Sequence, residues 1–278
     1  MFLRLAHPLG RYNPAMFRLT REVRFAVNLP SHNPPQNTPT NTYAGYPSLN
    51  GLGHFFALQI TFAGQLDPAT KFLQNIKMMD VLAREKCIPI VERAVREKQN
   101  DPTRLLLAMF DAMKNPAPGA TLDTLKLDLS PFLSVAAVSS ELPMTRLSQK
   151  FEFSASHRLF NPKFTDEENL KTFGKCSNPH GHGHNYELQV TLRGRANEKG
   201  LLMDIPAFEK TVRDAVITRF DHKNLNVEVP EFKNSLPTVE NIAATIYGML
   251  KPKLQTNGIA LAAVTVWETP KTWCEYSE

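Results

Sequence analysis

The sequence has few cysteines and no long apolar run, and both deficits narrow the class of protein. Three cysteines in 278 residues, Cys87, Cys176 and Cys274, are too few for a disulfide framework and predict a reducing, cytoplasmic setting. No apolar run approaches the roughly 18–20 residues that cross a membrane. We also expect no signal peptide and interpret residues 1–16 as a loose N-terminal extension.

A strong excess of charge is also missing. The net charge is +5, the pI is about 9.1, and the basic residues are dispersed along the chain. The sequence therefore lacks the Lys/Arg-rich run that is typical of a nucleic-acid interface. A mild basic bias suits a phosphorylated small molecule. We expect a small-molecule substrate, with no nucleic acid and no membrane as partners.

Histidines are concentrated in C-S-N-P-H-G-H-G-H-N-Y-E-L-Q-V, residues 176–190. Side chains alternate between the two faces of a strand, so His182 and His184 point to one face, and His180 shares their parity. Two imidazoles on one face are half of a zinc site, and this local pattern leaves open which histidines bind. The intervening glycines leave room for a ligand or for another backbone.

An internal repeat organises the rest of the chain. F-R-L-T-R-E-V-R-F-A-V-N-L (17–29) matches T-R-L-S-Q-K-F-E-F-S-A-S-H (145–157) at an offset of 128. G-L-G-H-F-F-A-L-Q-I-T-F-A-G (51–64) matches G-H-G-H-N-Y-E-L-Q-V-T-L-R-G (181–194) at an offset of 130. Two matches in the same order indicate an ancient tandem duplication.

The repeat predicts an α+β fold of two tandem modules, each an antiparallel four-stranded sheet with two helices on one face. The modules are expected at 17–140 and 145–278, joined by a linker at Ser139 to Met144. The predicted elements are hairpins at 17–29 with 54–64 and 145–157 with 183–195, helices near 76–95, 102–113, 206–216 and 238–250, and closing hairpins at 122–140 and 260–276.

Metal chemistry is predicted for the second half only. His157 ends a strand that should pair with the strand of His182 and His184, which gives three imidazoles on one face. Three histidines with an open fourth position are typical of catalytic zinc. The first half has Leu29 and Leu52 at the places of His157 and His182, so we interpret it as a degenerate copy without a metal site. A solvated histidine loop is the competing interpretation.

Four further residues are candidates for proton transfer or binding. Cys176 is a candidate base or nucleophile, because Lys175 and a nearby metal would lower its pKa. Asp221 and His222 are adjacent and form a candidate relay, with a helix cap or a surface pair as the alternative. Glu268 lies in an apolar strand and needs a donor-rich partner unless it faces outward.

Five motifs together resemble the 6-pyruvoyl tetrahydropterin synthase family over residues 145–278: F-S-A-S-H-R-L, D-E-E-N-L-K-T-F-G-K-C-S-N-P-H-G-H-G-H-N-Y, F-D-H-K-N-L, P-T-V-E-N-I-A and W-E-T. The resemblance implies the tunnelling (T-fold) architecture. It implies that zinc is bound by His157, His182 and His184, that Cys176 is the base, that Asp221 and His222 are the relay, and that Glu268 and Thr238 bind the pterin. His180 stands where that family commonly has Asn, and Val239 where it often has a second Thr.

The implied reaction is elimination of triphosphate from 7,8-dihydroneopterin triphosphate to give 6-pyruvoyl tetrahydropterin. The alternative is 6-carboxy-tetrahydropterin synthase of the queuosine (deazapurine) pathway, which typically has a shorter interval between its cysteine and H-G-H. The six positions from Cys176 to His182 favour the pyruvoyl type. A non-catalytic T-fold binding or scaffold protein is the third possibility.

The resemblance also implies an assembly. Six modules make two stacked rings in the family, with sites between neighbouring modules, and this chain carries two modules. The first half has no counterpart of Asp221 and His222, so a ring that alternates the halves would leave sites incomplete. We therefore predict segregated rings in a homotrimer that forms a pseudo-hexamer.

Overall fold

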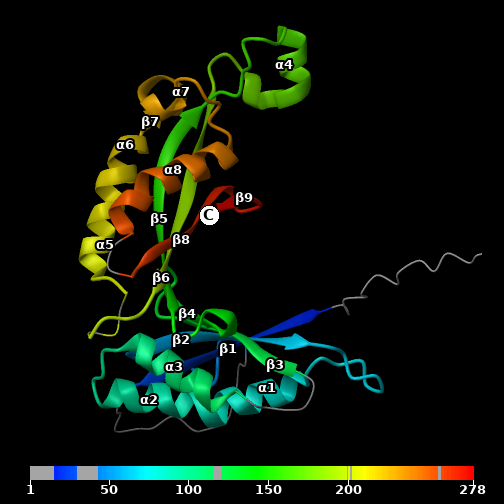
Figure 1. The fold of residues 1–278 in the computed structure, drawn as a ribbon, viewed down its shortest axis with the longest axis vertical. Coiled ribbons are helices and arrows are strands. Elements are labelled where there is room, and N and C mark those ends of the chain that lie inside the picture. The colour runs from blue at the N-terminus through cyan, green and yellow to red at the C-terminus, as the bar shows by residue number, and fades with distance from the viewer. Residues whose placement is uncertain (1–15, 30–42, 115–119, 199, 201, 256–257) are drawn as a thin grey trace, which may run out of the picture.

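One continuous sheet runs through both halves of the chain (Figure 1). The computed structural model describes residues 16–29, 43–114, 120–198, 200, 202–255 and 258–278. The strands follow the order β1-β2-β3-β4-β5-β6-β8-β9, and β7 pairs with β5. All pairs are antiparallel except β5 with β7, which confirms the α+β class. The predicted N-terminal extension lies outside the described residues except for Met16.

The predicted strands and helices are present at the expected places. The N-terminal half contains β1 (Phe17–Asn28), β2 (Gly53–Gly64), α1 (Ile76–Leu82), α2 (Ile88–Arg96), α3 (Pro102–Ala112), β3 (Ala120–Asp128) and β4 (Leu133–Val138). The C-terminal half contains β5 (Thr145–His157), α4 (Asp166–Phe173), β6 (His182–Gly194), α5 (Ile205–Val212), α6 (Thr218–Phe220), β7 (Lys223–Asn224), α7 (Leu225–Glu228), α8 (Val239–Leu254), β8 (Ala260–Thr269) and β9 (Thr272–Tyr276).

The two halves share irregular features at matching positions. A π-helical turn follows α1 at Ala83–Cys87, and another follows α5 at Arg213–Ile217, 130 positions later. The strand register shifts at Thr61 in β2 and at Thr191 in β6, again 130 positions apart. π-helical turns are rare in globular proteins, so a coincidence of two such irregularities at one offset is difficult to explain without a common origin.

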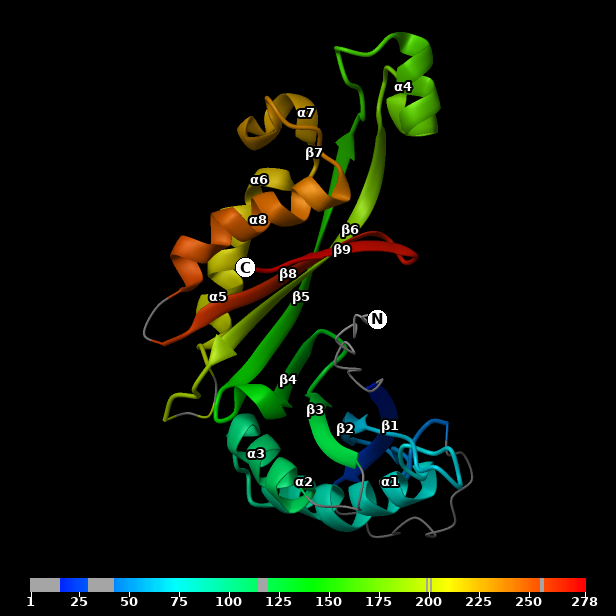
Figure 2. The ribbon, with the colours of Figure 1, turned by 45° about the vertical axis from the view of Figure 1, so that its right-hand side comes forward.

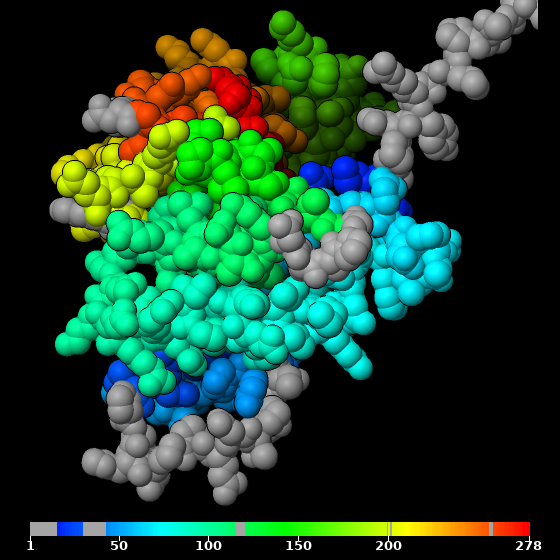
Figure 3. All heavy atoms as spheres, turned by 60° about the horizontal axis from the view of Figure 1, so that its bottom comes forward, coloured from blue at the N-terminus to red at the C-terminus, as the bar shows by residue number. Residues whose placement is uncertain are grey.

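Helices cover one face of the sheet in each half. α5 and α8 lie beside β5, β6 and β8 (Figure 2). α1, α2 and α3 cover the N-terminal half when the molecule is seen from its lower end (Figure 3). Alternation along β6 shows which face is covered, because Leu188 and Val190 are fully buried and Glu187 is exposed. Each fully buried side chain of this kind stabilises the fold by about 1.5–3 kcal/mol.

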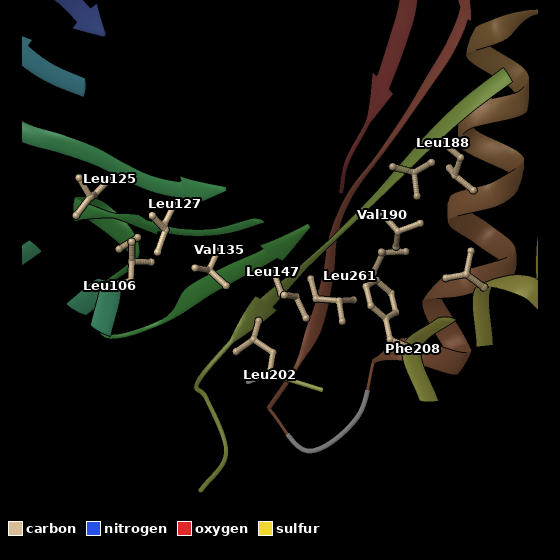
Figure 4. Close-up of a cluster of buried hydrophobic side chains, with 14 of the residues drawn as sticks. Leu106, Leu125, Leu127, Val135, Leu147, Leu188, Val190, Leu202, Phe208 and Leu261 are labelled. Carbon is tan, nitrogen blue, oxygen red and sulfur yellow. The ribbon is translucent and has the colours of Figure 1, made fainter. Parts of the chain in front are cut away.

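The junction between the halves is a pair of strands with a common core. β4 pairs with the first residues of β5, and Val135 lies opposite Leu147. Both side chains are buried, and they join Leu127 of the N-terminal half to Leu261 of the C-terminal half in one hydrophobic cluster (Figure 4). Among the described residues, no helix is long and apolar enough to span a membrane.

This junction corrects one prediction. Segregation of the two halves into separate rings is wrong, because the β4–β5 pairing places both halves in the same sheet. The sequence comparison identified equivalent strands but contained no information on which strand edges meet. A ring closed through the edges of this sheet must alternate the two halves.

Candidate active site

Three histidines converge where β5 ends and β6 begins. The register sets His157 directly opposite His182, and His184 follows two positions later on the same face. The ligating atoms of all three lie within 4.8 Å of one another. The Nε2 atoms of His157 and His182 are 3.1 Å apart. The structure therefore brings together the three histidines that the sequence pointed to.

Glycine 181 makes the tight approach of the two strands possible. A Cβ built on Gly181 would lie 2.7 Å from the carbonyl oxygen of His157, and the residue has a φ of +67°. A side chain at this position would clash with the backbone of the opposite strand. A residue other than glycine would also be strained in this left-handed backbone conformation. The close backbone approach that the H-G-H-G-H pattern predicted is therefore present, and it sets His182 beside His157.

The histidine nitrogens are arranged to accept a cation. Nδ1 of His157 lies 2.7 Å from the carbonyl oxygen of Pro237, so it donates a proton there and leaves the Nε2 lone pair free. Nε2 of His184 is buried without a hydrogen-bond partner among the described residues. Burial lowers the pKa of both His157 and His184, which favours the neutral imidazole that binds metals.

A carboxylate lies beside this group of donors. Oε1 of Glu268 lies 3.4 Å from Nε2 of His157 and 3.6 Å from Nε2 of His184. Ligands on a tetrahedral ion with bonds of about 2.0–2.1 Å are about 3.3–3.4 Å apart, and the 3.1 Å between the Nε2 atoms of His157 and His182 is close to that spacing, so the histidines fit a small tetrahedral cation such as zinc. Glu268 had been expected to read the pterin ring, and that role stays a prediction. Its observed place is beside the imidazoles.

Cys176 is carried to the site by a helix that the sequence analysis did not predict. α4 begins with a capping box between Thr165 and Glu168, and the T-D-E-E signal for it is present in the sequence. The turn after α4 carries Cys176, whose carbonyl oxygen accepts a hydrogen bond of 2.8 Å from the N–H of Leu159. This bond fastens the cysteine loop to the chain just beyond His157.

The protein groups around Cys176 do not produce the lowered pKa that was expected from Lys175, and the expected effect of a metal stays a prediction. Lys175 and a metal were expected to lower the thiol pKa. In the structure the pKa of Cys176 is raised, first by burial and then by the negative charge of Glu268. The protein groups alone therefore favour the thiol, and a thiolate at this position requires a nearby cation.

Asp221 and His222 form the predicted pair. Nδ1 of His222 is 2.8 Å from Oδ2 of Asp221. Ser154 of β5 holds both residues: its N–H donates to Oδ1 of Asp221 at 2.8 Å, and its carbonyl oxygen accepts from the N–H of His222 at 2.6 Å. These bonds, the one from Ser154 first, lower the pKa of Asp221. His222 lines a groove of about 530 Å³ together with His184.

Two other predictions concern Thr238 and the loss of the metal site in the N-terminal half. Thr238 caps α8, since its hydroxyl accepts a bond of 3.3 Å from the N–H of Asn241, and its pterin contact stays a prediction. In the N-terminal half, Leu29 and Leu52 are exposed and His54 stacks on Phe56 with ring centres 6.3 Å apart. His157, His182 and His184 form the only potential metal cluster found among the described residues.

A larger groove of about 750 Å³ lies far along the chain from this site, beside β1 and α1. Its arginines are already engaged: Arg21 pairs with Asp80, and Arg24 pairs with Glu22. This groove is the larger of the two, but the convergence of titratable groups makes the histidine cluster the better candidate for the active site.

Sequence reasoning missed one residue of the site, Tyr186. It shares the strand parity of His182 and His184, but the sequence analysis gave it no role. Its ring lies 5.5 Å from that of His184 and 6.2 Å from that of His157, and its hydroxyl is buried without a partner among the described residues. The only available signal was its position two residues after His184.

Comparisons with known proteins agree with this placement of the chemistry. The profile of the family described as "6-pyruvoyl tetrahydropterin synthase" matches residues 146–278. The human 6-pyruvoyl tetrahydrobiopterin synthase is 42% identical over 125 residues, which are 45% of this chain and 85% of that protein. The Haemophilus influenzae 6-carboxy-5,6,7,8-tetrahydropterin synthase is 26% identical over 156 residues, 49% of this chain and 100% of that protein.

Among solved structures, 6-pyruvoyl tetrahydropterin synthase from Caenorhabditis elegans is similar to this chain. Sequence identity is 37%, the match covers 50% of this chain and 98% of that one, and the TM-score is 0.46. The matched family profile begins at the second residue of β5 and runs to the last residue of the chain.

The choice of ligands can be tested by metal content. We expect the zinc-loaded protein to hold one zinc ion per chain and the His184→Ala variant to hold almost none, because a buried nitrogen donor is lost. His180→Ala is the matched control, since His180 is exposed and should be dispensable. Zinc loss in His180→Ala, or two zinc ions per chain, measured by atomic absorption, would contradict this assignment.

Proposed function

This chain belongs to the 6-pyruvoyl tetrahydropterin synthase family, and we propose that it is a zinc-dependent lyase that eliminates triphosphate from 7,8-dihydroneopterin triphosphate to give 6-pyruvoyl tetrahydropterin. The convergence of His157, His182 and His184 beside Glu268 is the observation that carries the proposal. The identity of 42% with the human synthase supports the choice of reaction.

The donor set fits a catalytic zinc ion. His157, His182 and His184 would hold it, and the buried Nε2 of His184, which has no hydrogen bond within the described part of the chain, is the strongest sign that a cation belongs there. When bound, zinc polarises a hydroxyl of the substrate and acidifies the adjacent C–H bond. The protein supplies the neutral imidazoles, through burial and through the bond between His157 and Pro237.

The remaining residues handle protons. Cys176 would remove the proton from the carbon beside that hydroxyl, and a bound cation would supply the stabilisation that its thiolate lacks from the protein groups alone. His222 passes protons along the groove that it shares with His184, and Asp221 fixes its ring. Glu268 and Thr238 bind the substrate. The carboxylate lies 3.4 Å from Nε2 of His157, so Glu268 acts at the reacting end of the pterin as well as on its ring.

The two halves have divided roles in this proposal. Residues 17–140 form a degenerate T-fold module and residues 145–278 the catalytic module, each built on four antiparallel strands. The π-helical turns at Ala83–Cys87 and Arg213–Ile217 support their common origin. We place the protein in the cytoplasm, in keeping with its three free cysteines.

The alternative product is 6-carboxy-tetrahydropterin. The same substrate and the same metal would serve both reactions, and the Haemophilus relative is the observation in favour. Its identity of 26% is lower than the 42% of the human synthase, so the pyruvoyl product is preferred. A non-catalytic scaffold would bind zinc without turnover.

Product analysis tests the proposal directly. We expect the zinc-loaded chain, incubated with 7,8-dihydroneopterin triphosphate, to release triphosphate and form 6-pyruvoyl tetrahydropterin, as followed by chromatography and mass spectrometry. A 6-carboxy product would support the alternative enzyme. Zinc binding without consumption of the substrate would support the scaffold.

The role of Cys176 can be separated from metal binding. We expect Cys176→Ala to lower kcat by about 10²–10⁴-fold, the usual contribution of a general base, and to keep the full zinc content. Cys87→Ala is a control, because Cys87 is buried in the N-terminal core and should affect stability alone. Unchanged turnover in Cys176→Ala would remove the cysteine from the mechanism.

Assembly follows from the free edges of the sheet. β1 and β9 end the strand order, and within the described residues the loop at Tyr46 and Pro47 covers only the Arg24–Ala26 part of β1. The β4–β5 junction supports one way for such edges to meet between copies, because repeat equivalents of β9 and β1 pair there inside one chain. We propose that β9 of one copy pairs with β1 of the next.

The internal junction also gives the register. At β4–β5, Ala136 lies opposite Arg146. The same register between copies sets Glu275 opposite Arg18, so opposite charges face each other, a contact worth about 0.2–1 kcal/mol. Trp273 beside Glu275 is 57% exposed in the single chain and would be covered.

A charge swap tests this interface. We expect Glu275→Arg and Arg18→Glu each to reduce the mass measured by light scattering at micromolar concentration, because like charges would face each other. The double variant should restore the wild-type mass. Lys210→Glu, on the exposed face of α5, is the control and should change nothing. Single variants that assemble normally would exclude this pairing.

A further inference from the structure

Tyr186 carries a buried hydroxyl that the fold does not explain. The residue is 0% exposed in β6, and its hydroxyl has no hydrogen-bond partner among the described residues. An unsatisfied buried hydroxyl costs about 1–3 kcal/mol, and in native proteins such groups require a specific explanation. Replacement by Phe would remove this cost, so the hydroxyl is not there for stability.

The N-terminal half shows that the packing does not need the hydroxyl. The ring of Tyr186 stacks on Phe153 with centres 4.9 Å apart, and 130 positions earlier Phe56 stacks on Phe25 at 5.5 Å. The same aromatic pair therefore occurs in both halves, with a phenol only in the half that keeps the three histidines. The hydroxyl therefore occurs together with the three histidines and is not needed for the aromatic packing.

The surroundings of Tyr186 define what its hydroxyl can meet. Tyr186 lies next to the last pair between β6 and β8, Glu187 with Trp267, and Glu268 follows Trp267 in the chain. Both residues lie against the same imidazoles: Oε1 of Glu268 is 3.6 Å from Nε2 of His184, and the ring of Tyr186 is 5.5 Å from the ring of His184. A phenol hydroxyl is a hydrogen-bond donor, and the Glu268 carboxylate is an acceptor beside the same imidazoles.

Glu268 needs such a donor once the site is loaded. In this structure its Oε1 lies against Nε2 of His157 and of His184. Those nitrogens are the ones that would bind the metal, after which they have no proton to offer the carboxylate. A carboxylate without a fixed hydrogen-bond donor would adopt several orientations, and catalysis depends on a single productive orientation.

We propose that Tyr186 is a positioning residue, whose buried hydroxyl donates a hydrogen bond to the Glu268 carboxylate in the metal-loaded protein and fixes it toward the substrate. This inference rests on the proposed function for its kinetic consequence, but not for the contact itself. The bond also satisfies the hydroxyl, so the cost of burying it is recovered when the site is loaded.

Tyr186→Phe is the central experiment. We expect unchanged zinc content, a Tm equal to or above that of the wild type, and a kcat lower by about 10–100-fold with little change in KM, the usual effect of losing one hydrogen bond to a charged group. Tyr247→Phe is the matched control. Its buried hydroxyl donates to the carbonyl oxygen of Leu261 at 3.2 Å, so this variant should lose stability and keep kcat.

A double-mutant cycle distinguishes positioning from packing. If Tyr186 acts through Glu268, then the Tyr186→Phe effect should disappear in a Glu268→Gln background. Multiplicative losses in the double variant, or an unchanged kcat in Tyr186→Phe, would overturn the inference.

A crystal structure of the zinc-loaded wild type gives a readout independent of turnover. We expect the Tyr186 hydroxyl within about 2.5–3.0 Å of a Glu268 oxygen. A longer separation would overturn the inference even in an active enzyme. Absence of turnover together with this contact would refute the proposed function and leave the positioning contact standing.

Discussion

The antiparallel pairing of β5 with β6 is the constraint on which the site depends. Its register sets His157 opposite His182 and sends His184 and Tyr186 to the same face. A slip of one residue would turn every side chain of β6 to the other face and separate the histidines. Gly181 allows the close approach at the open end of the ladder, and the bond from His157 to Pro237 ties this end to the start of α8.

Much of the fold could be predicted because the same pattern of strands and helices occurs twice in the sequence, once in each half. The hairpin strands, the helix after Thr238 and the closing hairpins all follow from alternation, caps and the repeat offset. The joining of β4 to β5 could not be predicted, because pairing between repeat units depends on which backbone edges meet and leaves no pattern in the sequence. α4 was missed although Thr165 and Glu168 carry a capping signal.

Some features of the candidate site could also be predicted from the sequence, and others could not. The contacts among the three histidines, and between Asp221 and His222, followed from strand parity and adjacency. The raised pKa of Cys176 did not, because burial depends on how the loop after α4 folds back and not on the neighbouring residue in sequence. The unsatisfied hydroxyl next to the site was equally hidden, since sequence shows a hydrogen-bonding group but not its partners.

The shared sheet has a consequence for how the C-terminal half meets its neighbour. At the edge of β5, the partner strand β4 is attached by a covalent linker instead of being recruited from solution. A tethered partner is present at an effective concentration in the millimolar range, whatever the amount of protein in the cell. Dilution can therefore separate one chain from another, but it cannot uncover this edge. The N-terminal half is therefore a permanently attached neighbour of the C-terminal half.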